Sequence, residues 1–441
     1  MVGPPPAPAH PHRDPVTCIL SQLLTHQEED GLPAGEPVVR ERAWQWARPQ
    51  IEGEGPKARG GHSATLVGPT DPQKASARIV LFGGHYDGGK GEGFVYLNDT
   101  HILDIDENTW SQPRCRGTAP EARYGHSAAL VGSRVVYFGG KGKTTHFRDL
   151  HALDTSSLTW FQGPSSGGAP SARSGHTATL HGTRLYVFGG SCDRKYFGDL
   201  HCLDLASMAW SSPLSTGPKP SARCGHAAVL VGESLLIHGG FCMDSSDIAA
   251  KDNSGDLLRD CYKNDIRVLD LGHMLWSRLR THGSPPSGRF GHTLALSEDD
   301  AVLFGGWSGT GGQVAPGVAF ALKDKVNAKS GQAAQGAEQD QSCEYCMTLR
   351  TSDMQWVRNT FSGLPAQKRY GHSTTAVGPH LIIFGGWDGG KPLNDVVVLR
   401  DRSVGERAAA AEEPVYAAER QDGEQDGWTQ EDDYNMESEY S

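Results

Sequence analysis

The chain has 441 residues, of which 56 are glycine and 26 are proline, and its formal net charge is −11. Glycine and proline destabilise a helix by about 1 and about 3 kcal/mol per position, and average proteins contain only about 12 % of the two together. The composition therefore excludes a helix-rich fold and favours many short strands joined by turns. No stretch approaches the roughly 20 apolar residues of a spanning helix, so we expect no membrane insertion.

The N-terminal segment and the cysteines indicate the compartment. Residues 1–15 are rich in proline and lack the apolar core of a secretory signal, and most of the nine cysteines stand alone in the sequence. Reduced thiols in the cytoplasm, or in the nucleus, fit this pattern. The acidic charge disfavours a nucleic-acid partner, because such proteins usually present a basic face. Residues 1–39 form a Pro-rich segment that we expect to be mostly disordered.

A repeated pattern occupies most of the remaining chain. The string R-x-G-H occurs six times, each time followed by an apolar stretch and a Gly-Gly pair. Four repeats continue with the string D-x-x-x-L-D, and five end on a tryptophan that stands thirteen residues before the next repeat arginine. The repeats begin at Arg59, Arg123, Arg173, Arg223, Arg289 and Arg369. Such regular self-similarity predicts one structural unit per repeat.

Each repeat is predicted to form four short strands. In the second repeat, residues 126–131 and 134–138 alternate in polarity and predict strands A and B, residues 150–153 predict strand C, and the segment around Trp160 predicts strand D. Four strands per unit, at a period of about 50 residues, are typical of a β-propeller blade. Because each blade buries its faces against its neighbours, residues 40–403 require only one domain.

With six repeats in phase, the sequence resembles the kelch-repeat propellers over roughly residues 40–400. The resemblance implies an all-β fold, a six-bladed kelch-type β-propeller. The sixth repeat has no tryptophan at the expected position, Glu406, whereas Trp46 stands thirteen residues before Arg59. We therefore predict that an N-terminal strand around Trp46 completes the last blade and closes the ring, next to strand C near Leu399.

Two insertions lengthen the connections between strands B and C. The distance from the Gly-Gly pair to the tryptophan is 21 residues in repeats two and three, 37 in repeat four and 51 in repeat five. In an up-and-down blade the B–C and D–A connections lie at the same end, so both insertions belong to one face. Loops on a rigid scaffold often carry binding residues, although a tolerated insertion without function explains them equally well. The second insertion, residues 309–342, is poor in apolar residues and is expected to be disordered.

Large aromatic residues gather in two columns of the repeat that open onto this face. The residue after the Gly-Gly pair is Phe241, Trp307 and Trp387 in repeats four to six, and the residue after the repeat arginine is Phe290 and Tyr370 in repeats five and six. Aromatic residues are enriched in interface hot spots. We therefore predict a partner-binding patch formed by these five residues. The alternative is that some of them fold inward beneath the loops.

No catalytic residue, cofactor or metal site is expected. The six repeat histidines occupy one equivalent position per blade, so a turn-anchoring hydrogen bond explains them better than a shared metal ion. The six arginines are expected to pair with aspartates or backbone carbonyls of their own blade rather than to line a basic mouth. Cys343 and Cys346 form a lone C-x-x-C, which is weak evidence for a metal or redox site. The sequence contains no nucleophile elbow, phosphate loop or dinucleotide fingerprint.

Residues 404–441 form an acidic tail that we expect to be disordered. Between residues 411 and 441 eleven acidic residues stand against one base, Arg420, with aromatic residues interspersed. Most of the net charge therefore belongs to the tail, and the propeller itself is nearly neutral. Such a segment is usually solvated, although it also suits a linear motif that orders on a basic partner.

The resemblance implies a non-enzymatic scaffold or adaptor that binds a protein partner through the face of the B–C and D–A loops. We find no BTB or F-box pattern, and we expect a monomer. The alternative is a metal-dependent enzyme, since the copper-dependent galactose oxidases and the iron-dependent nitrile specifiers also have kelch folds. Neither of their motifs can be matched residue by residue in this chain.

Overall fold

The computed structural model describes residues 42–68, 77–89, 92–163, 166–243, 261–308 and 344–402. All of them belong to the first of the two units into which the chain divides, Met1–Arg402 and Ser403–Ser441. The disorder expected for residues 1–39, 309–342 and 404–441 therefore lies outside the described residues.

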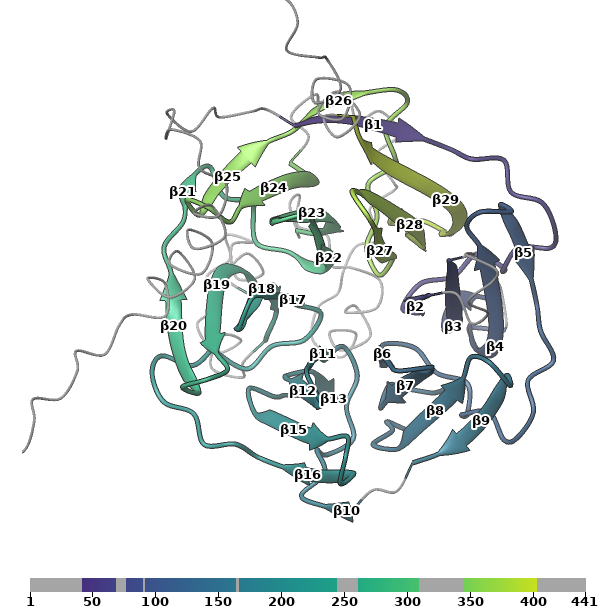
Figure 1. The fold of residues 1–441 in the computed structure, drawn as a ribbon, viewed down its shortest axis with the longest axis horizontal. Coiled ribbons are helices and arrows are strands. Elements are labelled where there is room, and N and C mark those ends of the chain that lie inside the picture. The colour runs from purple at the N-terminus through teal and green to yellow at the C-terminus, as the bar shows by residue number, and fades with distance from the viewer. Residues whose placement is uncertain are drawn as a thin grey trace, which may run out of the picture. The chain divides into compact units, whose positions relative to one another are not determined.

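The described residues form strands and turns that are arranged as six radial sheets around a central axis (Figure 1). In each sheet four antiparallel strands follow one another from the axis outwards in the order A, B, C, D. The all-β, six-bladed propeller predicted from the repeats is confirmed.

Blades 1 to 3 follow the chain in order. Blade 1 consists of β2 (Ser63–Val67), β3 (Arg78–Asp87), β4 (Phe94–Asp104) and β5 (Thr109–Ser111). Blade 2 consists of β6 (Ser127–Val131), β7 (Arg134–Phe138), β8 (Leu150–Asp154) and β9 (Thr159–Gln162). Blade 3 consists of β11 (Thr177–His181), β12 (Arg184–Phe188), β15 (Leu200–Asp204), β16 (Ala209–Ser211) and the parallel outer strand β10 (Ser166–Gly167). Its B–C connection forms a hairpin of β13 (Ser191–Cys192) and β14 (Lys195–Tyr196).

Blades 4 to 6 repeat the arrangement, and the last one uses both ends of the ring. Blade 4 consists of β17 (Ala227–Val231), β18 (Ser234–Phe241), β19 (Tyr262–Asp270) and β20 (Leu275–Leu279). Blade 5 consists of β22 (Phe290–Ser297), β23 (Asp300–Trp307), β24 (Cys346–Arg350), β25 (Gln355–Arg358) and the parallel outer strand β21 (His282–Gly283). Blade 6 consists of β27 (Ser373–Val377), β28 (His380–Trp387), β29 (Pro392–Asp401), β1 (Ala43–Ala47) and the parallel outer strand β26 (Thr360–Ser362).

The N-terminal strand closes the ring as predicted. Strand β1 pairs antiparallel with β29, and Trp46 lies directly opposite Leu399. The side chains of Trp44 and Trp46 are buried in a cluster shared by blades 5 and 6. Arg42, just before β1, adds an ion pair to Asp300 of blade 5 at 3.2 Å. The first and last parts of the described chain are therefore held together within one sheet.

The apolar core is distributed between the blades. Each of the six main clusters of buried side chains combines residues of two adjacent blades, including a cluster shared by blades 6 and 1. This arrangement fits a repeat architecture in which each unit packs only against its neighbours.

Each repeat arginine is buried inside its own blade, and in five blades it binds the aspartate near the start of strand C. Arg123 contacts Asp149 through two parallel pairs, Nη1–Oδ1 at 2.6 Å and Nη2–Oδ2 at 2.9 Å, and donates to the carbonyl of Gly139 at 2.9 Å. The same bidentate pair recurs in blades 1, 3, 4 and 6. Burial by itself would raise the pKa of the Asp265 carboxyl, but the hydrogen bond from Arg223 lowers this pKa to about 2. The predicted pairing within the blade is confirmed: these five arginines bind an aspartate, and Arg289 of blade 5 binds the backbone carbonyl of Gly305.

Blade 5 departs from this rule, because Tyr345 stands where the other blades have aspartate. Arg289 donates to the carbonyl of Gly305 at 2.8 Å and to the hydroxyl of Ser287 at 3.2 Å. Among the described residues, no carboxylate forms a hydrogen bond with it, and burial lowers the pKa of its guanidinium to about 10. The charge of Glu344 acts in the opposite direction but forms no hydrogen bond with the guanidinium, so this buried charge is less well compensated than those of the other five blades.

The repeat histidines connect neighbouring blades, which corrects the expected turn-anchoring role. Nε2 of His126 in blade 2 lies 2.9 Å from Oγ of Ser63 in blade 1, and blades 1, 3, 4 and 6 use the equivalent hydroxyl of the preceding blade. Blade 4 has Ala227 where the other blades have this hydroxyl. The repeat histidine of blade 5, His292, contacts His238 of blade 4 instead, with 2.9 Å between its Nε2 and Nδ1 of His238. The partner lies in the preceding blade because the side chains of a radial sheet point towards the neighbouring sheets.

A closed ring of six backbone hydrogen bonds surrounds the axis where the A strands begin. The third residue of each R-x-G-H string is a glycine with φ between +59° and +67°, a conformation that glycine adopts without strain. Each donates its N–H to the carbonyl of its counterpart in the preceding blade at 2.7–2.8 Å. The six glycines are Gly61, Gly125, Gly175, Gly225, Gly291 and Gly371. This ring forms the floor of the face described next.

Candidate partner-binding face

Two variable positions of each repeat meet at the blade end that carries the B–C and D–A connections. The residue after the repeat arginine pairs with the residue after the Gly-Gly pair; in blade 2, Tyr124 and Lys141 exchange two backbone hydrogen bonds of 2.9 Å. From blade 1 to blade 6 the pairs are Gly60–His85, Tyr124–Lys141, Ser174–Ser191, Cys224–Phe241, Phe290–Trp307 and Tyr370–Trp387. The two columns therefore lie side by side on one face of the ring.

The structure brings the five predicted aromatic residues together and buries three of them. Phe290 lies 6.3 Å from Phe241 and 5.9 Å from Tyr370 between ring centroids, and Trp307 lies 5.6 Å from Tyr370. Phe241, Tyr370 and Trp387 are 1 %, 8 % and 6 % exposed, whereas Phe290 and Trp307 are half-buried. The buried three support the surface from below, and the half-buried two are the members that remain accessible.

The aromatic cluster continues onto blades 1 and 2. The ring of Phe94, at the start of β4, lies 6.0 Å from Trp387, and Tyr96 lies 5.7 Å from Tyr124. His85 contacts Trp387 at 5.6 Å, and burial lowers its pKa to about 4, so the ring is neutral at pH 7. We call the half-buried members of this surface the aromatic arc: Phe290, Trp307, Phe94, Tyr96 and Tyr124.

Sequence reasoning missed the part of the aromatic arc on blades 1 and 2. Phe94 and Tyr96 belong to neither repeat column, because they lie on an extension of the hairpin of β3 and β4 that only the structure reveals. Tyr124, in contrast, stands in the column after the repeat arginine, so it was a visible signal.

Glycine at one column position explains why Trp387 is buried. A Cβ atom added to Gly60 of blade 1 would lie only 2.3 Å from Cδ1 of Trp387 of blade 6. The missing side chain in one blade therefore leaves the space that the indole of the preceding blade occupies.

Blades 2 and 3 present a different surface. Their column residues are polar apart from Tyr124, and they include Lys141, Ser174 and Ser191. Beside them, His146, Cys192 and Asp193 bring their ligand atoms within 4.8 Å of one another, the only such group of three that the described part of the chain contains. Sequence reasoning missed this group, because its members come from two blades and share no short motif.

In the part of the chain that the structure describes, no helix has the length and apolar character needed to cross a membrane.

The match to family models defines the class of protein. Residues 73–306 match the model of the KLHDC2/KLHL20/DRC7 Kelch-repeats domain, and residues 368–400 match that of the Kelch motif. The chain therefore belongs to the kelch-repeat family of β-propeller proteins.

Several curated proteins are similar over part of their length. The chain is 33 % identical over 96 residues to Kelch domain-containing protein 3 of Bos taurus, which is 22 % of this chain and 22 % of that protein. It is 37 % identical over 103 residues to Acyl-CoA-binding domain-containing protein 4 of Arabidopsis thaliana, 23 % of this chain and 14 % of that protein. These matches thus span less than a quarter of the relatives' length.

A solved structure supports the fold. The structure of YjhT superposes with a TM-score of 0.51 at 16 % identity, and the match covers 80 % of this chain and 97 % of that one. At this level of identity the likeness concerns the fold alone.

Proposed function

We propose that this chain is a non-enzymatic scaffold or adaptor that binds a protein partner through the face of the B–C and D–A connections. The kelch propeller fold supports protein-interaction scaffolds in general. The observation that carries the finer proposal is the pairing of the two variable columns on this face, with aromatic residues on consecutive blades.

The contrast between constant and variable positions supports this choice of face. The repeat arginine, histidine and glycines recur in all six blades; the arginine makes contacts within its blade, and the histidine and glycine make contacts between blades. The two columns beside them differ from blade to blade while their backbones pair in the same way. Folding therefore does not dictate these side chains, and they are free to serve recognition.

Phe290 and Trp307 are the proposed anchors, because they form one backbone pair and both remain partly accessible. Aromatic anchors at the centre of an interface often account for 2 kcal/mol or more of binding energy, which corresponds to about 30-fold in affinity. Tyr370, buried beneath them, holds Phe290 and Trp307 in place through ring contacts.

The test compares the full chain with two variants. Proteins captured from a lysate by the wild type are identified, and the best candidate is titrated in purified form. The double variant F290A/W307A is expected to bind at least about 30-fold more weakly. Phe161→Ala is the matched control, because Phe161 is 44 % exposed on β9, the outermost strand of blade 2.

Equal affinity of the double variant, with both proteins folded by circular dichroism, would contradict the proposed face. Loss of binding in the Phe161 variant instead would move the interface to the outer rim. Stoichiometric copper or iron in the purified chain would favour the alternative of a metal-dependent enzyme.

A further inference from the structure

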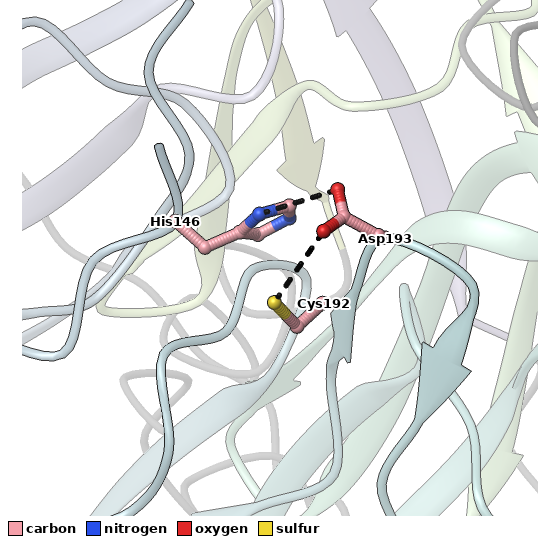
Figure 2. Close-up of side chains that lie close together, drawn as sticks. All are labelled: His146, Cys192 and Asp193. Atoms are coloured by element: carbon pink, nitrogen blue, oxygen red, sulfur yellow. Dashed lines mark hydrogen bonds and ion pairs between the residues drawn. The ribbon is translucent and has the colours of Figure 1, made fainter. Parts of the chain in front are cut away.

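Two loops of neighbouring blades converge at one point of the same face. His146 lies in the B–C connection of blade 2, where its backbone bridges to Lys141, and Cys192 and Asp193 belong to the β13–β14 hairpin of blade 3. Figure 2 shows the three side chains pointing towards one another, with the Asp193 carboxylate between the imidazole and the thiol. Nitrogen, sulfur and oxygen ligands are thus brought together by tertiary structure.

The spacing of the ligand atoms is close to that of a tetrahedral zinc site. Nδ1 of His146 lies 3.7 Å from Oδ1 of Asp193, and Sγ of Cys192 lies 4.0 Å from Oδ2 of Asp193. Zinc bonds of tetrahedral geometry would place N and O about 3.4 Å apart, and S and O about 3.6 Å apart. The two distances end on different carboxylate oxygens, and all three ligand atoms lie within 4.8 Å of one another, so rotation of the exposed Asp193 side chain together with a contraction of the loops would complete the geometry.

The imidazole of His146 is well suited to bind a cation. Its side chain is 7 % exposed, and Nδ1 is too far from the Asp193 carboxylate for a hydrogen bond. Among the described residues, its ring makes no hydrogen bond that would occupy its lone pair.

The thiol and the carboxylate complete the ligand set. The Cys192 thiol directs its proton towards Oδ2 of Asp193, 4.0 Å from Sγ. Zinc binding replaces this proton: the S–H bond breaks, a Zn–S bond forms, and one H⁺ leaves to solvent for each ion bound. The side chain of Asp193 is 77 % exposed, which provides a path of entry and leaves the fourth position open to water.

A simple ion-pair network is the competing interpretation. Nζ of Lys141 lies 4.0 Å from Oδ1 of Asp193, and its positive charge repels a metal ion bound at the same carboxylate. An ion pair at such an exposed carboxylate is weak, however, and the lysine chain is long enough to turn into solvent. The ion pair between Lys141 and Asp193 does not explain why the Cys192 thiol and the His146 imidazole lie close together.

We propose that His146, Cys192 and Asp193 bind a Zn²⁺ ion that joins blades 2 and 3 on the face of the B–C connections. The thiolate excludes Mg²⁺ and Ca²⁺, which prefer oxygen ligands, and the mixed N, S and O set is typical of zinc. The ion fixes the β13–β14 hairpin, whose Tyr196 packs 5.9 Å from Phe241 at the edge of the aromatic cluster.

The experiment uses the reduced, metal-stripped full chain and Co²⁺ as a spectroscopic probe. The wild type is expected to show thiolate-to-cobalt charge transfer in the near ultraviolet and the intense visible bands of tetrahedral cobalt. Zn²⁺ should displace the cobalt and release about one proton per site. The Zn²⁺ affinity, measured by competition with a chelating dye, is expected to fall at least about tenfold in C192S, H146A and D193N.

Two controls separate this site from other thiols and histidines. Cys343→Ser removes half of the C-x-x-C pair, and His273→Ala removes a histidine whose side chain is 75 % exposed. Both controls should keep the cobalt spectrum and the rise in melting temperature on addition of Zn²⁺. A spectrum that is absent in the wild type, survives in C192S, or disappears in C343S would overturn the proposal.

Discussion

Acidification from pH 7.5 to pH 5.5 should unfold the propeller, because its buried histidines cannot accept a proton in the folded state. The six repeat histidines and His238 are buried, and burial is the main cause that lowers the pKa of each one; for His62, His176, His226 and His238 the value is about 3. In the other three, the pKa also lies well below 6.5.

The sign and size of the effect follow from linkage. The folded-state pKa is lower than the unfolded value of about 6.5, so the unfolded chain binds more protons and stability falls as the pH decreases below 6.5. Between pH 7.5 and 5.5 each histidine favours the unfolded state by about 1.4 kcal/mol, and seven of them by on the order of 10 kcal/mol. A typical domain has only about 5–15 kcal/mol of stability.

The assay is urea denaturation followed by tryptophan fluorescence at several pH values. The slope of the unfolding free energy against pH gives the protons taken up on unfolding, which should reach at least about six near pH 5.5, because His85, with its pKa of about 4, adds to the seven. His126→Gln should reduce this slope by about one proton. A denaturation midpoint that stays constant from pH 7.5 to 5.5 would refute the reasoning, since the ring would then accommodate charged histidines.

Three further predictions concern the scaffold. Deleting residues 1–49 removes β1 and its two buried tryptophans, so the melting temperature should fall by many degrees; an unchanged value would reject closure by this strand. Arg123→Met should cost about 1–3 kcal/mol in chemical denaturation because it leaves the half-buried Asp149 with His151 as its remaining side-chain partner, and Arg289→Met should cost clearly less; equal losses would contradict the role given to the ion pair. Gly60→Ala should cost about 1–3 kcal/mol by displacing the indole of blade 6, whereas Gly68→Ala, with nothing within 4 Å of its added Cβ, should be nearly neutral in thermal unfolding.

The scaffold was predictable because its signals are local and repeated. The thirteen-residue spacing from each tryptophan to the next arginine located Trp46 in the last blade, and β1 pairs with β29 in that register. The pairing of the repeat arginines within their own blades was expected with aspartates or backbone carbonyls, and both occur: five bind the aspartate of strand C, and Arg289 binds a carbonyl.

The candidate site was only partly predictable, because exposure depends on the neighbouring blade. Phe241, Phe290 and Tyr370 were all visible in the repeat columns, yet only Phe290 retains appreciable exposure. Trp387 is covered because Gly60, one blade further on, leaves room for its ring. The pattern within one repeat contains no information on such a contact.

The sequence by itself determined the class of fold, the number of blades and the strand that closes the ring, because each depends on residue types recurring at regular spacing along the chain. Only the tertiary structure decided which aromatic side chains are accessible, that each repeat histidine bonds to the preceding blade, and that His146 meets Cys192 and Asp193. The physical reason is that these contacts join different blades, whose relative placement is set by closure of the whole ring.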